Sequence, residues 1–234
     1  VNPSGKLTDT WPVNFDDNPS SEGFANQDGN TAQELYNDDI FVGYRYYDTF
    51  GVDVSYPFGY GGSYTSFAMS TKSVKADKDK VTVQVKVKNT GTVSGKEVAE
   101  VYFSAPDGEL DKPYQELAGY AKTDELAPGE SQILTISFDT KEMGSYDTDK
   151  AAYVMEDGDY IIRVGNSSRN THVAAKLNVA EDTITEQYSN LMVPVTENDN
   201  IENSDKYPTL EPMTTEGATS VSYTHLTLPT ILRV

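Results

Sequence analysis

Side-chain carboxylates are the groups in this chain best suited to acid–base chemistry, because its 234 residues include 37 Asp and Glu. Asp38 and Asp39 invite a catalytic interpretation, since they stand side by side at the start of a segment rich in aromatic residues. General acid–base catalysis requires groups that converge on one bond, whereas adjacent residues point in different directions. We therefore interpret Asp38 as a cap or as a partner of Arg45, and we expect no catalytic role for the pair.

The sequence does not predict a metal site or a cofactor. The chain has no cysteine, and its two histidines, His172 and His225, are too few for a zinc site. Asp157-Gly158-Asp159 offers two carboxylates, whereas calcium takes about 6 to 8 oxygen ligands. We interpret this tripeptide as a turn.

The charge of the chain restricts its partners. A formal net charge of −19 argues against binding to nucleic acid, whose affinity depends on lysine and arginine at the phosphates. The same charge would repel an anionic lipid surface, and no apolar run of the sequence approaches the roughly 20 residues of a membrane helix. We expect neither nucleic acid nor a membrane among the partners. A polar, acidic surface fits a protein that handles neutral molecules.

Residues 36–67, called the aromatic segment below, form the most informative stretch of the sequence. Its rings belong to Tyr36, Phe41, Tyr44, Tyr46, Tyr47, Phe50, Tyr56, Phe58, Tyr60, Tyr64 and Phe67. Each such ring buries roughly 150 to 250 Å² when it packs, so a run this dense needs a large covering surface. Glycines between the rings let the backbone turn, which predicts an irregular joint between domains. The alternative is that the Tyr36 to Tyr64 aromatics form a platform on which a sugar stacks.

From residue 65 to about residue 180 the sequence changes to short strands separated by turn residues. Val81, Val83, Val85 and Val87 alternate with polar residues, which places the valines on one face of a half-buried strand. Further strands are expected at residues 67–74, 98–103, 115–123, 133–138, 153–155, 160–164 and 173–179. Strands of this number and spacing predict a two-sheet antiparallel sandwich of immunoglobulin-like type.

Tyr160 supports this fold class through its position. It follows the predicted turn and opens the strand at residues 160–164. Immunoglobulin-like sandwiches often use a tyrosine hydroxyl at such a corner to tie a loop to the sheet. We hypothesise that Tyr160 is this corner tyrosine, and the alternative is an ordinary aromatic residue of the core.

Several segments together resemble glycoside hydrolase family 3. Residues 39–47 and 57–65 are similar to the stretch through which these enzymes pass from an α/β sandwich domain into a fibronectin type III-like domain. Gly62 stands where the family usually has leucine. Similarity to the end of the family's α/β domain covers residues 2–7 and 11–12. Similarity to the signatures of its fibronectin type III-like domain covers residues 88–106, 112–131 and 153–169.

The resemblance implies a function as well as a fold. Family members are retaining, exo-acting β-glycosidases of β-glucosidase or β-xylosidase type, with a carboxylate nucleophile on a barrel and an acid/base often on the α/β domain. Neither motif stands in this chain, so we expect a non-catalytic fragment without catalytic, cofactor-binding or metal-binding residues. Its partners would be the missing barrel and α/β domains of the same polypeptide, with the barrel either upstream or downstream. The full enzyme would act on an oligosaccharide or another β-glycoside.

A different function class stays open. Sandwich domains also serve as stand-alone carbohydrate-binding or adhesion modules. An independent module has no reason to carry the aromatic segment, and this feature favours the hydrolase.

Four segments are expected in this mainly β chain. Residues 1–64 would form the end of the α/β domain and the aromatic connector, and residues 65–180 the fibronectin type III-like sandwich. Residues 181–220 are acidic and contain several prolines, which predicts a linker or a tail. Residues 221–230 resemble one reading frame of a sequencing adapter, and we interpret residues 221–234 as an artefact. A hydrophobic terminal strand is the alternative.

Overall fold

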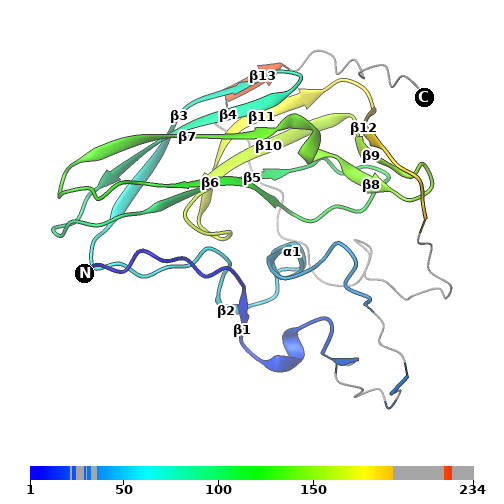
Figure 1. Ribbon diagram of the computed structural model, residues 1–234, viewed down its shortest axis with the longest axis horizontal. Coiled ribbons are helices and arrows are strands. Elements are labelled where there is room, and N and C mark those ends of the chain that lie inside the picture. The colour runs from blue at the N-terminus through cyan, green and yellow to red at the C-terminus, as the bar shows by residue number, and fades with distance from the viewer. Residues whose placement is uncertain (22, 25–28, 30, 33–35, 192–218, 223–234) are drawn as a thin grey trace.

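Two stacked β-sheets form the body of the protein, and the N-terminal segments lie along one side of it (Figure 1). The computed structural model describes residues 1–21, 23, 24, 29, 31, 32, 36–191 and 219–222. The first sheet has the order β3-β4-β7, formed by Phe67–Ala76, Lys80–Asn89 and Ser131–Asp139. The second has the order β13-β11-β10-β5-β6, formed by Thr219–Ser222, Thr171–Val179, Gly158–Gly165, Val98–Ser104 and Glu116–Lys122.

The strand pairing confirms the predicted sandwich. Neighbouring strands from β3 to β7 in the first sheet and from β11 to β6 in the second are antiparallel. Only β13 among the strands of these two sheets pairs in parallel, on the outer edge of β11. Each strand expected between residues 67 and 179 is present, with ends displaced by a few residues.

The core lies between the two sheets and follows the predicted alternation. The four alternating valines of β4 are fully buried and pack with Val101, Ile162 and Leu177 from the opposite sheet. Burial of side chains of this size stabilises the fold by roughly 1.5 to 3 kcal/mol each. The side chain of Tyr160 is also fully buried, and its hydroxyl donates a hydrogen bond of 3.3 Å to the carbonyl of Glu156. This bond confirms Tyr160 as the corner tyrosine.

A third sheet was not fully predicted from the sequence. It has the order β12-β9-β8, formed by Thr183–Gln187, Ala152–Met155 and Ser145–Asp147, and a short 3-10 helix, η3, spans Thr140–Met143 before it. β8 has three residues, too few for an alternating pattern to be recognised. β12 falls in the segment whose acidic composition suggested a linker. It contributes an edge strand through its pairing with β9.

The structure describes only part of the two C-terminal segments, the predicted linker at residues 181–220 and the predicted artefact at residues 221–234. Residues 192–218 of the predicted linker and residues 223–234 of the predicted artefact lie outside the described residues, and so does His225. Residues 221 and 222 belong to β13. The adapter origin of residues 221–234 stays a prediction.

The N-terminal part contains regular structure where the sequence suggested an irregular joint. β1 (Trp11–Pro12) pairs with β2 (Val54–Tyr56), a 3-10 helix η1 spans Phe15–Asp17, and helix α1 spans Tyr44–Thr49. Gly43 precedes α1 with φ 60°, a backbone angle that favours glycine. Phe50 follows Tyr46 by four positions and Tyr47 by three, and these separations place it on one helix face with both rings. This spacing is the sequence signal for the helix.

Among the described residues, no helix has both the length and the apolar composition that crossing a membrane would require.

Candidate functional site

The aromatic segment divides into a buried part and an exposed part. Phe41, Tyr46, Tyr47 and Phe50 are buried and pack into a small cluster of their own. The ring centroid of Phe50 lies 5.0 Å from that of Phe41 and 5.2 Å from that of Tyr46. Aromatic pairs at such distances contribute about 0.5 to 1.5 kcal/mol beyond the area that they bury. The first half of the segment therefore forms a second, smaller core beside the sandwich.

Helix α1 is attached to the sandwich through a buried charge. Arg169 Nε donates a hydrogen bond of 2.8 Å to Oδ1 of Asp48, and Gln115 Nε2 donates one of 3.0 Å to Oδ2. The side chain of Asp48 is only 2% exposed. Arg169 Nη2 also donates to the carbonyls of Tyr47 at 3.0 Å and Val52 at 2.7 Å. The contacts satisfy both carboxylate oxygens, as burial of a charge requires.

Two further side chains of α1 bind backbone groups of the sandwich. Thr49 Oγ1 accepts a hydrogen bond of 2.8 Å from the backbone N–H of Tyr114, and the Tyr44 hydroxyl accepts one of 2.8 Å from the N–H of Leu117. Burial raises the pKa of Tyr44, so its hydroxyl stays protonated. Side chains of α1 thus form hydrogen bonds with the start of β6 and with the loop before it.

Glu100 and Tyr102 lie on the outward face of β5 and are nevertheless buried. The Tyr102 hydroxyl donates a hydrogen bond of 2.6 Å to Oε2 of Glu100. The backbone at Gly59, with φ 78°, packs directly on this carboxylate, because a Cβ added there would lie 2.6 Å from Glu100 Oε1. Burial raises the pKa of both Glu100 and Tyr102. The aromatic segment therefore covers polar residues of the sheet.

Residues 2–7 also bind the sandwich. Lys6 Nζ lies 2.8 Å from Oε1 of Glu97 and donates a hydrogen bond of 3.0 Å to the carbonyl of Asn166. Leu7 N–H donates to the carbonyl of Tyr60 at 2.8 Å. Residues 2–7 and 57–65, which both resemble segments of the hydrolase family, are therefore bound to each other, and residues 2–7 are also bound to the sandwich.

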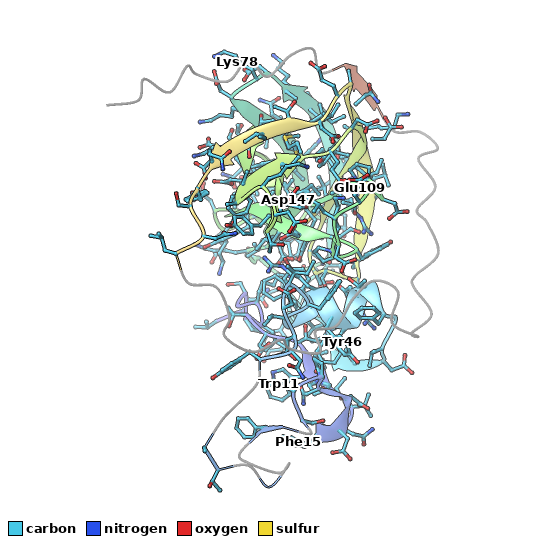
Figure 2. All side chains as sticks on the ribbon, turned by 90° about the vertical axis from the view of Figure 1, so that its right-hand side faces the viewer. Trp11, Phe15, Tyr46, Lys78, Glu109 and Asp147 are labelled. Carbon is cyan, nitrogen blue, oxygen red and sulfur yellow. The ribbon has the colours of Figure 1, made fainter. Side chains whose placement is uncertain are left out.

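Two of the exposed rings of the aromatic segment, together with one ring of β1, form what we call the aromatic surface: Trp11, Tyr56 and Tyr60. The rings of Trp11 and Tyr56 are 6.0 Å apart, and those of Tyr56 and Tyr60 are 4.9 Å apart. All three are exposed, and Figure 2 shows Trp11 and Phe15 on the part of the molecule away from the sandwich. The rings border a cleft of about 350 Å³ whose other lining residues are Gly5, Lys6, Leu7, Gly61 and Gly62.

Gly62 leaves this cleft open. A Cβ added at Gly62 would meet no atom within 4 Å, so the space directly beside this residue is open. An exposed apolar patch with a cleft is typical of an interface or of a ligand groove. The sequence suggested two roles for the Tyr36 to Tyr64 aromatics, a joint between domains and a platform on which a sugar stacks. Both roles would use this surface.

The carboxylates suggested by the sequence are not brought into a site. The backbone carbonyl of Asp38 accepts a hydrogen bond of 2.8 Å from Phe41 N–H, and burial raises the pKa of its carboxyl. Arg45 forms its ion pair with Glu116, at 3.1 Å. The predicted pairing of Asp38 with Arg45 is therefore wrong, because the guanidinium faces β6.

The prediction of a turn at Asp157-Gly158-Asp159 is wrong in part, because Gly158 and Asp159 pair with β11 as the first residues of β10. These residues and His172 do not form a metal centre. Asp159 accepts hydrogen bonds from Lys176 at 2.8 Å and Asn178 at 2.9 Å, which hold its pKa below the usual value. His172 Nε2 lies 3.0 Å from Thr71 Oγ1. Within the described part of the chain, no three Asp, Glu or His side chains are grouped so that they could hold a metal ion.

Sequence reasoning did not identify the residues that attach α1. Asp48 and Arg169 are 121 positions apart, and no local pattern reports a contact over such a separation. The sequence places Trp11 in a segment that resembles the hydrolase family, but it does not predict that Trp11 belongs to the aromatic surface. Its pairing partner Tyr56 lies 45 positions away, and only the register of β1 with β2 reveals their contact.

Comparisons with known proteins confirm the expected relationship. The family of fibronectin type III-like domains (Fn3-like) matches residues 97–168. The chain is 42% identical over 217 residues to beta-glucosidase A of Butyrivibrio fibrisolvens, covering 83% of this chain and 26% of that protein. It is 42% identical over 202 residues to a beta-glucosidase of Ruminococcus albus, covering 84% of this chain and 21% of that one.

Solved structures give the same result for the fold. A beta-glucosidase from Paenibacillus barengoltzii superposes with a TM-score of 0.79 at 44% identity, over 84% of this chain and 22% of that one. Beta-glucosidase 3B from Thermotoga neapolitana superposes with a TM-score of 0.73 at 43% identity, over 78% of this chain and 25% of that one. The chain thus spans about a fifth to a quarter of the length of the relatives that it matches.

Proposed function

We propose that this chain, a relative of the β-glucosidases that carries a fibronectin type III-like domain, is the non-catalytic supporting part of a retaining, exo-acting β-glycosidase of glycoside hydrolase family 3. The longer enzyme would remove terminal β-linked glucose or xylose from an oligosaccharide or another β-glycoside. Residues 1–64 would complete its α/β domain, and residues 65–180 would brace that domain from one side.

One structural relationship carries this proposal. Side chains of α1 are bound to the sandwich through buried polar contacts, and the N-terminal part of the chain exposes the aromatic surface elsewhere. Three neighbouring aromatic rings around a cleft of about 350 Å³ are what an adjoining domain of the same polypeptide would cover. The sandwich would then hold the aromatic surface in position against that domain.

The chemistry of the proposed enzyme would lie outside these residues. Retaining hydrolysis requires two carboxyl groups about 5 to 5.5 Å apart on opposite sides of the glycosidic bond. The family motifs that supply the nucleophile and the acid/base are absent from the sequence. The chain alone is therefore expected to hydrolyse no glycoside.

The test is to recover and express the complete gene and to assay the product with aryl β-glucosides and aryl β-xylosides. We expect hydrolysis with retention of anomeric configuration. A well-folded, complete product that hydrolyses neither substrate class would reject the proposal.

The supporting role has a separate test in the same complete protein. Trp11→Ala should lower the temperature at which activity is lost, because it removes a ring from the proposed domain interface. Tyr120→Ala is the matched control, since Tyr120 is an exposed aromatic residue of β6 outside the aromatic surface. Equal effects of the two substitutions would argue against the interface.

A further inference from the structure

A second group of exposed aromatic residues lies on the small sheet β12-β9-β8, which Figure 1 shows at one end of the sandwich, away from β1 and β2. Tyr153 of β9 stands between Tyr146 of β8 and Tyr188, which follows β12. Its ring centroid lies 5.2 Å from that of Tyr146 and 5.9 Å from that of Tyr188. The three residues, called the tyrosine strip below, are 37%, 38% and 51% exposed in chain order.

Hydrogen bonds hold the two outer rings of the strip in place. The Tyr188 hydroxyl donates a hydrogen bond of 2.7 Å to Oε2 of Glu186, and the Tyr146 hydroxyl donates one to Oδ1 of Asn190. Asn190 Nδ2 in turn donates to the carbonyl of Thr148 at 2.7 Å. Rings fixed before binding lose little conformational freedom when a ligand arrives, which favours affinity.

The strip borders a cleft that also contains polar groups. The cleft has a volume of about 380 Å³ and is lined by Lys141, Glu142, Gly144, Tyr153, Glu186 and Tyr188. Small-molecule sites commonly occupy roughly 300 to 1,000 Å³. Glu186 accepts one bond from Tyr188 and one of 2.6 Å from Lys141. A carboxylate offers about four acceptor positions, so Glu186 retains capacity for hydroxyl groups of a ligand.

We propose that the tyrosine strip and this cleft bind a neutral saccharide. Tyrosine rings offer a large, stiff and amphipathic contact surface to the C–H faces of a sugar ring, while Glu186 and Lys141 would bind its hydroxyl groups. The net charge of −19 and the carboxylates of Glu142 and Glu186 at the cleft disfavour an anionic ligand. The site would hold a saccharide chain on the surface of the protein and perform no chemistry.

The choice of a β-linked glucan as probe rests on the proposed function. The experiment is affinity electrophoresis of the 234-residue chain through a gel that contains neutral mixed-linkage β-glucan, followed by calorimetric titration with cellotetraose. We expect the glucan to retard the chain. Tyr153→Ala and Tyr188→Ala should each lower the association constant by at least about tenfold, as loss of a central aromatic contact does.

Two control variants locate the binding. Tyr120→Ala removes an exposed tyrosine of β6 outside the strip, and Trp11→Ala removes a ring of the aromatic surface. Both should bind the glucan as the unmodified chain does. Circular dichroism of every variant establishes that it is folded. Tyr188 lies beyond the last residue of β12, so Tyr188→Ala tests the strip even if Tyr153→Ala fails to fold.

Several results would overturn the inference. These are no retardation of the unmodified chain, unchanged affinity in folded Tyr188→Ala, or loss of binding in Trp11→Ala instead. Retardation by a polycation and not by the glucan would show a purely electrostatic surface, and it would also overturn the inference. Hydrolysis by the complete enzyme without glucan binding here would leave the proposed function intact. Binding here without hydrolysis would reject that function alone.

Discussion

Arg169 Nε lies 2.8 Å from Oδ1 of Asp48, and this contact joins helix α1 to the loop between β10 and β11. Gln115 Nε2 binds the other carboxylate oxygen, so three separate parts of the chain meet at one buried charge. The guanidinium of Arg169 also binds the carbonyl of Val52, beyond the end of the helix. Helix α1 and the residues that follow it therefore fold as one unit with the sandwich.

Removal of Arg169 should destabilise this unit strongly. In Arg169→Met, the buried carboxyl of Asp48 loses its ion pair and keeps the hydrogen bond from Gln115. Because leaving one partner of a buried ion pair uncompensated is costly, the free energy of unfolding should fall by about 3 kcal/mol. Urea denaturation followed by circular dichroism measures the change.

The matched control for Arg169→Met is Lys176→Met, which breaks the more exposed ion pair with Asp159. Surface pairs of this kind contribute about 0 to 1 kcal/mol. Losses of the same size in the two variants would contradict the special role of the Asp48 contact.

Local patterns predicted the sandwich well. The alternating valines of β4, the turn residues between strands and the corner at Tyr160 each depend on neighbouring positions, and the structure confirms them. The attachment of α1 could not be predicted, because Asp48, Gln115 and Arg169 meet only after the strands have assembled. The clustering of aromatic residues signalled burial but not which rings are buried. Phe50 lies in the small core, whereas Tyr56 and Tyr60 are exposed.

The corner hydrogen bond of Tyr160 gives a second prediction. Tyr160→Phe retains the buried ring and removes the hydroxyl that binds the carbonyl of Glu156. The loss of one net hydrogen bond should lower the free energy of unfolding by about 1 kcal/mol. Tyr120→Phe, at an exposed position of β6, serves as control and should leave stability unchanged. An unchanged midpoint of urea denaturation for Tyr160→Phe would show that the bond contributes nothing.

Gly59 allows a third prediction, because the chain contains a suitable reference glycine. Gly59 and Gly129 have φ of 78° and 81°, so alanine at either position pays the same backbone penalty, on the order of 1 kcal/mol. Gly129→Ala meets no atom within 4 Å, whereas Gly59→Ala also collides with the Glu100 carboxylate. The loss in free energy of unfolding should therefore be clearly larger for Gly59→Ala. Equal losses would mean that the segment above Glu100 moves away without cost.

The burial of Glu100 predicts an unusual dependence of stability on pH. Burial raises the pKa of Glu100 above its ordinary value of 4.5, the charge of Glu97 adds to this, and the Tyr102 hydroxyl and Lys6 oppose it. Between the unfolded and the folded pKa, the folded state holds more protons than the unfolded state. The contribution of Glu100 to stability therefore falls as pH rises through this window.

Replacement of Glu100 by glutamine tests the direction of this pH dependence. Glu100→Gln keeps an oxygen that accepts from Tyr102 and carries no charge, so its stability relative to the unmodified chain should improve as pH rises from about 4 to about 7. Asp159→Asn should show the opposite trend and at lower pH, because Lys176 and Asn178 lower the pKa of Asp159 below its ordinary value of 3.8, so that its contribution is lost only as pH falls below about 4. Urea denaturation at a series of pH values measures both differences. If Glu100→Gln followed the same trend as Asp159→Asn, the carboxyl of Glu100 would be solvated, and the aromatic segment would not cover β5 in solution.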